Sequence, residues 1–135
     1  AEAAYLQALR VDSGDTVAMS NLARLYDRRG DAESAAAFRR RVERHRQRNP
    51  YYRYHRALEA YTAGDCETAV RHLRAAIRAK SNEDQFYALL GACAAARGDR
   101  RAARRWLARA SEVAATEAEK EAYSSKLEHL LAASR

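Results

Sequence analysis

The sequence has few of the residues that break helices or form covalent cross-links. Its 135 residues include one proline, five glycines and two cysteines. No stretch alternates polar and apolar residues with the period of two that a half-buried strand requires. No apolar run approaches the roughly 20 residues that a membrane-spanning helix needs. These absences favour an all-α chain, and an apolar content of 47% is enough for a continuous core.

Sequence motifs of catalysis and cofactor binding are also missing. There is no GxSxG, no P-loop and no HExxH. Cys66 and Cys93 lie 27 residues apart without CxxC spacing, and we interpret them as small residues of helix packing. The four histidines fall on four different predicted helices: His45, His55, His72 and His129. The sequence predicts no catalytic residue, no metal site, no cofactor and no enzyme activity.

What the sequence does have is a repeat. A Gly-Asp pair occurs three times, each 34 residues after the one before: Gly30-Asp31, Gly64-Asp65 and Gly98-Asp99. The same period carries small or β-branched residues in two series: Ala1, Ala35, Ala69 and Ala103, and Ala8, Val42, Ala76 and Ala110. We expect the glycine to end one helix in the left-handed conformation and the aspartate to cap the next. The small residues should let the two helices of a hairpin cross closely.

These patterns predict eight helices in one domain. The expected ranges are 1–12, 16–29, 32–47, 50–63, 66–80, 83–97, 100–113 and 117–133. The domain would contain a half repeat at 1–14, full repeats at 15–49, 50–81 and 82–115, and a capping helix at 116–135. In that last helix Thr116 and Glu119 form a capping box, and Tyr123, Leu127, Leu130 and Leu131 should face inward.

The three full units resemble tetratricopeptide (TPR) repeats. The third, FYALLGACAAARGDRRAARRWLARA, has an aromatic residue at Tyr87, then Leu90-Gly91, Ala94, Gly98-Asp99, Ala103, Leu107 and Ala110. The resemblance implies a right-handed α-α superhelix of antiparallel helix pairs. The proline that usually closes the second helix is absent, and the only proline, Pro50, follows Asn49. That pair predicts a helix cap and a first helical position, after a preceding helix that is longer than average.

The N-terminal residues match only the second helix of a repeat. We therefore expect Tyr5, Leu6 and Leu9 to be partly exposed, which allows end-to-end self-association of two chains. We also expect the chain to be part of a larger, bacterial protein. No basic-then-apolar leader is present, which favours the cytoplasm but does not fix the compartment.

The net charge of +7 is concentrated on predicted second helices. Arginine outnumbers lysine 22 to 3, and the densest run is RRRVERHRQR, with Arg39, Arg40, Arg41, Arg44, Arg46 and Arg48 on one helix. Such a convex surface could attract RNA or an acidic partner. A solvated outer face in a chain biased towards arginine explains it as well, and we therefore place nucleic acid second.

The resemblance also implies where a partner would bind. In TPR arrays the first helices line a concave groove in which peptides or helices dock. The matching residues here are Asn21, Arg24, Arg28, Tyr51, Tyr54, His55, Leu58, Tyr61, Gln85 and Leu89. Any of the tyrosines could instead fill a gap between hairpins. The favoured function is a non-catalytic module that binds a protein or peptide, with no role for a membrane. The alternatives are RNA or acidic-partner binding by the convex arginines, or an accessory domain of an enzyme whose catalytic part lies upstream.

Overall fold

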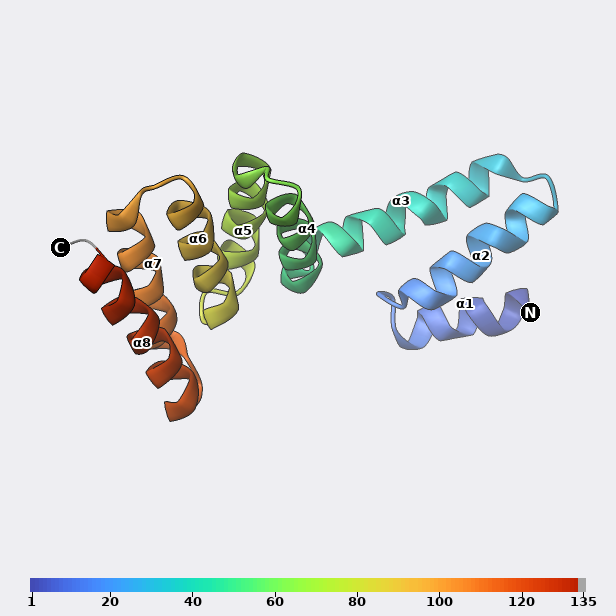
Figure 1. Ribbon diagram of the computed structural model, residues 1–135. Helices are drawn as coiled ribbons and strands as arrows, with labels where there is room; N and C mark the ends of the chain where they lie inside the picture. Colours follow the sequence, from blue (N-terminus) through green and yellow to red (C-terminus); the bar gives the residue numbers. More distant parts are fainter. Residues whose placement is uncertain (134–135) are drawn as a thin grey trace. The chain divides into compact units, whose positions relative to one another are not determined.

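The computed structural model describes residues 1–133, and every regular element in that range is an α-helix. The eight helices are α1 Glu2–Val11, α2 Thr16–Arg28, α3 Ala32–Arg48, α4 Pro50–Thr62, α5 Cys66–Ala79, α6 Asp84–Ala96, α7 Arg100–Val113 and α8 Glu117–Ala133 (Figure 1). The predicted all-α class, the number of helices and their order are confirmed. None of the helices within residues 1–133 combines the length and the apolar character that a membrane span requires.

The chain divides into two compact units. The N-terminal unit comprises Ala1–Arg48 and the C-terminal unit comprises Asn49–Arg135. Helices that follow each other in sequence pack together within each unit: α1 with α2 and α2 with α3, then α4 with α5 and so on to α8. The boundary falls within a residue of the predicted end of the first full repeat. The grouping of all repeats into one domain stays a prediction.

The Gly-Asp turns join the two helices of each hairpin in the predicted manner. Gly64 has a φ of +82°, a left-handed conformation that costs glycine little. Its amide donates to the carbonyl of Tyr61 at 3.0 Å, and the Asp65 amide donates to the carbonyl of Ala60 at 2.8 Å. The Asp65 carboxylate then accepts the amide of Thr68 at 3.0 Å and caps α5. The same three bonds form around Gly30-Asp31 and Gly98-Asp99.

The small residues of the repeat are buried within the packed hairpins. Ala35, Ala69 and Ala103 are fully buried. The second series is also buried in the full repeats: Val42, Ala76 and Ala110. In the half repeat, by contrast, Ala1 is exposed and Ala8 is half-buried. Burial therefore depends on the presence of the partner helix, as expected of a helical repeat.

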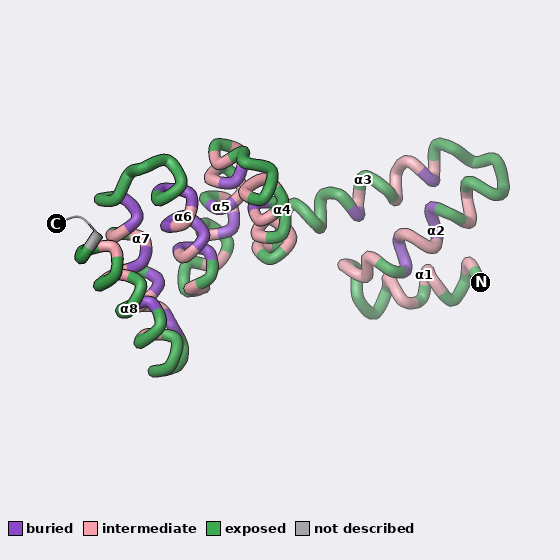
Figure 2. Tube along the Cα trace, viewed as in Figure 1, coloured by how far each residue is buried: buried purple, intermediate pink, exposed green. Residues whose placement is uncertain are grey.

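The core of the C-terminal unit is built around α6. In Figure 2 buried stretches of this unit run along α5, α6 and α7. Phe86 of α6 is the largest fully buried side chain, and Leu73 of α5 is also fully buried. Leu107 of α7 and Tyr123 of α8 belong to the same cluster. Because α6 lies between the hairpin before it and the helices after it, it carries apolar residues on several sides.

The core of the N-terminal unit is smaller. It consists of Ala18, Met19, Leu22 and Ala23 of α2 with Ala35 and Val42 of α3. Helix α1 buries no residue, and Tyr5, Leu6 and Leu9 are half-buried, which confirms the predicted partial exposure. Polar contacts help to hold α1: the Glu2 carboxylate accepts from the hydroxyl of Tyr26 at 2.8 Å and from Arg29 at 2.6 Å. The hydrogen bond from Arg29, then that from Tyr26, lowers the pKa of Glu2.

The unusual proline acts as predicted. Helix α3 is 17 residues long, against 14 for α5 and α7, and it ends at Arg48. The side chain of Asn49 accepts the amide of Tyr51 at 2.9 Å, and Pro50 occupies the first turn of α4. The connection between α3 and α4 is thus a single residue.

Helix α8 packs on α7, the position expected of a capping helix. The Thr116 hydroxyl accepts the amide of Glu119 at 3.2 Å, as the capping box predicts, whereas the Glu119 carboxylate reaches the amide of Ala115. Tyr123 is buried, and its hydroxyl donates to Asp84 of α6. Leu131 is exposed, so the expectation that it faces inward is wrong. It lies one residue, and so about 100°, beyond the half-buried Leu130.

Candidate functional site

Three of the predicted groove residues come together in the N-terminal unit. Asn21, Arg24 and Arg28 of α2 line a hollow of about 340 Å³ with Tyr5 of α1 and Asp27. Arg24 donates to the side-chain oxygen of Asn21 at 3.0 Å. The hollow thus offers two guanidinium groups beside a half-buried tyrosine ring, a surface suited to a polar or acidic peptide.

In the C-terminal unit, the predicted tyrosines of α4 pack mainly against α6. The Tyr54 ring lies 5.5 Å from the Phe86 ring, and the Tyr51 ring meets the same side chain edge-on at 5.9 Å. The Tyr51 hydroxyl donates to Glu83 at 2.9 Å, and this bond, with burial, raises the pKa of Tyr51. For Tyr54, burial is the main cause of a raised pKa. Tyr54 therefore fills space between neighbouring hairpins, whereas Tyr51 packs there while part of its surface stays exposed.

The remaining predicted residues of this unit differ in exposure. Leu89 is buried, and Leu58 and Tyr61 are half-buried against the core cluster. His55 and Gln85 are exposed, as is Tyr51, of which 45% remains accessible. The residues left open to a partner in this unit are therefore Tyr51, His55 and Gln85.

The arginines of α3 do not form one uniform surface. Arg39 pairs with Asp27 of α2, and Arg41 lies over the Phe38 ring at 5.3 Å from its centre. Three of the others, Arg40, Arg44 and Arg48, line a hollow of about 410 Å³ together with Glu43 and Gln47. Two of the six arginines in the run are thus held by contacts within the unit.

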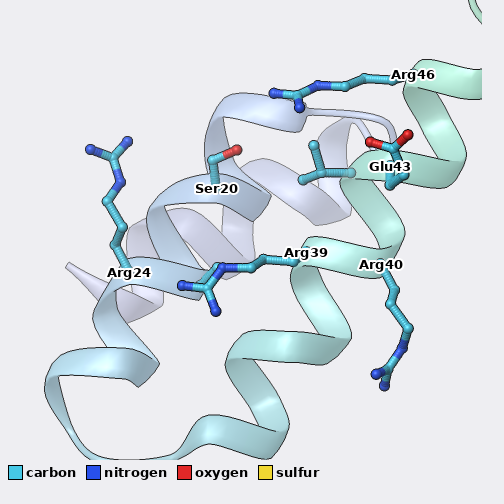
Figure 3. Close-up of a pocket in the computed structure, with 8 residues that line it drawn as sticks. Ser20, Arg24, Arg39, Arg40, Glu43 and Arg46 are labelled. Carbon is cyan, nitrogen blue, oxygen red and sulfur yellow. The ribbon is translucent and has the colours of Figure 1, made fainter.

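A larger hollow, of about 540 Å³, lies between α2 and α3. Ala23 and Val42 form its buried apolar base, and its other lining residues are polar or charged: Ser20, Arg24, Arg39, Arg40, Glu43 and Arg46. In Figure 3 the side chains of Arg39 and Arg46 extend from α3 towards α2, whereas Arg40 points away from them. Sequence reasoning missed this hollow. The signal was available, because the 34-residue register places Arg24 and Arg39 at positions that are apolar in both later repeats.

The two cysteines, which the sequence left unconnected, lie near each other. Cys93 of α6 is 1% exposed in the core cluster, and Cys66 at the start of α5 packs against the same cluster. Burial, followed by a hydrogen bond with Cys66, raises the pKa of the Cys93 thiol to about 12. A thiol held protonated in this way is a poor nucleophile at neutral pH.

The raised pKa of Cys93 predicts a pH dependence of stability. An unfolded chain ionises this thiol above its ordinary value of 9.0, whereas the folded chain keeps the proton up to about pH 12. The stabilisation is therefore complete below pH 9.0 and is lost as the pH rises towards 12. Urea unfolding at a series of pH values should show a steeper loss of stability for the natural chain than for Cys93→Ala. Parallel losses in the two chains would contradict the prediction.

Among residues 1–133, no group of three histidine, cysteine or acidic side chains lies close enough to hold a metal ion. Neither the family models nor the curated proteins to which the chain was compared gave a match.

Proposed function

We propose that the chain is a non-catalytic interaction module of the tetratricopeptide type, which binds a segment of a partner protein. The observation that carries the proposal is the hollow in which Asn21, Arg24 and Arg28 of a first helix lie together with Tyr5 of the preceding half repeat. A helical repeat with paired helices, left-handed glycine turns and small crossing residues supports it further.

The chemistry of this hollow suits peptide recognition. Arginine and tyrosine are the residue types most often found to dominate binding energy at protein interfaces. Arg24 and Arg28 outnumber the one acid of the hollow, Asp27, and Asp27 already pairs with Arg39. The hollow therefore has an excess of positive charge. A partner segment that carries carboxylate and amide groups would find donors on Arg24, Arg28 and Asn21.

The test starts from a random peptide library selected on the intact chain. We expect the double variant Asn21→Ala with Arg28→Glu to bind the selected peptides at least about tenfold more weakly, because both lost groups line the hollow. Isothermal titration calorimetry would measure the affinities, and circular dichroism would verify that the helices are retained.

A matched control is available on α3. Arg44→Glu with Gln47→Ala makes the same change in charge and amide content, but both residues line a different hollow on α3. This variant should bind the selected peptides within about twofold of the natural chain, a change too small to indicate a lost contact. Equal loss in both variants, or a library that yields no binding peptide, would refute groove binding.

A further inference from the structure

The N-terminal unit departs from the later repeats on the face where α2 and α3 meet. Thirty-four residues after Arg24 and Arg39 stand Leu58 and Leu73. In the C-terminal unit Leu73 is fully buried and Leu58 packs against the cluster that contains Phe86 of α6. At the positions that correspond to Arg24 and Arg39, the second full repeat therefore has leucines that pack in the cluster with Phe86 of the following helix, α6.

The third full repeat repeats the apolar pattern. At the positions that correspond to Arg39 and Arg46, it has Leu107 and Ala114, and both are buried in the cluster that Tyr123 of α8 completes. Both later repeats thus have apolar residues at the positions of Arg24 and Arg39, whereas at the position of Arg46 the second full repeat has Lys80 and the third has Ala114. A face that carries these arginines is poorly suited to burial against another apolar helix, because the guanidinium groups would lose their hydration.

The hollow on this face has a mixed chemistry. Its base is apolar, formed by Ala23 and Val42, and four arginines and one acid, Glu43, surround it. Two of the arginines already have a contact: Arg39 pairs with Asp27, and Arg24 donates to Asn21. The excess positive charge around an apolar base is complementary to a ligand that has carboxylates and one apolar group.

We propose that this hollow binds an acidic segment of a partner protein, with carboxylates on Arg39 and Arg46 and one apolar side chain over Val42. The site goes beyond the groove described above: it shares Arg24 with that groove, but most of its other lining residues lie on the second helix α3. A peptide is favoured over RNA because no aromatic side chain, on which a base could stack, lines the hollow. The hollow is also confined to one place, whereas a nucleic acid would follow an extended basic stripe.

The experiment uses three fluorescein-labelled peptides and the intact chain. The first has a leucine flanked by runs of glutamate; in the second glutamine replaces glutamate, and in the third serine replaces leucine. Fluorescence anisotropy at about 150 mM salt, where screening of exposed charges is strong, would measure binding. The variant is Arg39→Glu with Arg46→Glu, and the control is Arg44→Glu with Arg48→Glu, which makes the same charge change on the same helix.

We expect the first peptide to bind and the other two to bind at least about fivefold more weakly. The Arg39 and Arg46 variant should bind the first peptide at least about tenfold more weakly, a loss that one or two ionic contacts buried on binding would explain. The control should stay within about threefold, because its arginines lie outside the hollow. Arg46→Ala, which removes no ion pair with Asp27, should show a smaller loss in the same direction.

Absence of binding, equal loss in the control, or no effect of the leucine would overturn the proposal. Binding of single-stranded RNA in place of the acidic peptide, with loss in the Arg39 and Arg46 variant, would do so too.

Discussion

Replacement of Phe86 by alanine is expected to lower the free energy of unfolding of the C-terminal unit by about 3–5 kcal/mol. The side chain is fully buried at the centre of the cluster, and the rings of Tyr51 and Tyr54 pack on it. Loss of the Phe86 ring would leave a cavity, because the surrounding helices pack on one another and cannot all move in to fill it. Urea unfolding followed by circular dichroism would give the change, and hydrogen exchange would place it on α4 to α8.

The chain offers a matched control in its only other phenylalanine. Phe38 is half-buried, where it stacks on Tyr26 with the ring centres 5.8 Å apart. Phe38→Ala removes the same atoms from a partly exposed site and should cost about 1–2 kcal/mol, since less apolar area leaves water there. A Phe38 variant that is as damaged as the Phe86 variant would contradict the central role of Phe86.

Leu22→Ala is expected to destabilise the N-terminal unit by about 2–5 kcal/mol. Leu22 is fully buried, and the few other residues of that core are mostly alanine. Loss of the one large aliphatic side chain that is fully buried there removes a major part of the core. We therefore expect α2 and α3 to lose hydrogen-exchange protection, while α6 keeps it.

Leu25→Ala is the control for Leu22, since Leu25 lies on the same helix and is half-buried. The pattern of protection also tests the predicted single domain. If Leu22→Ala lowers protection in α6 as much as in α2, the two units unfold together and form one cooperative domain. If protection is lost in α1 to α3 alone, they unfold separately, and the single-domain prediction is wrong.

Much of the fold could be predicted because the repeat constrains it locally. Gly64 and Asp65 form a turn because one helix must end and the next must be capped there. Ala69 is small because it is fully buried within the hairpin. Each of these requirements acts within one hairpin and recurs with the period. The half-buried state of α1 agrees with its packing against α2 alone within the described residues.

The candidate sites were less predictable because exposure depends on the neighbouring repeat. The period assigns Tyr54 and Leu89 to first helices but does not say which helix covers them. The structure places Tyr54 against Phe86 and buries Leu89. The proximity of Cys66 and Cys93 is a similar case, since contacts between helices of different hairpins leave no short motif in a sequence.

The Gly-Asp turns also determine where the chain can change in length. The Asp65 amide closes α4 and its carboxylate opens α5, so one residue belongs to the ends of two helices. An insertion between Gly64 and Asp65 would separate these two functions, and both helix ends would lose hydrogen bonds. The connection between α5 and α6 has no such double role: the Lys80 amide donates to Ala76 at the end of α5, and Glu83, a different residue, precedes α6 without a side-chain cap. Insertions should therefore be tolerated in this connection and excluded from the Gly-Asp turns.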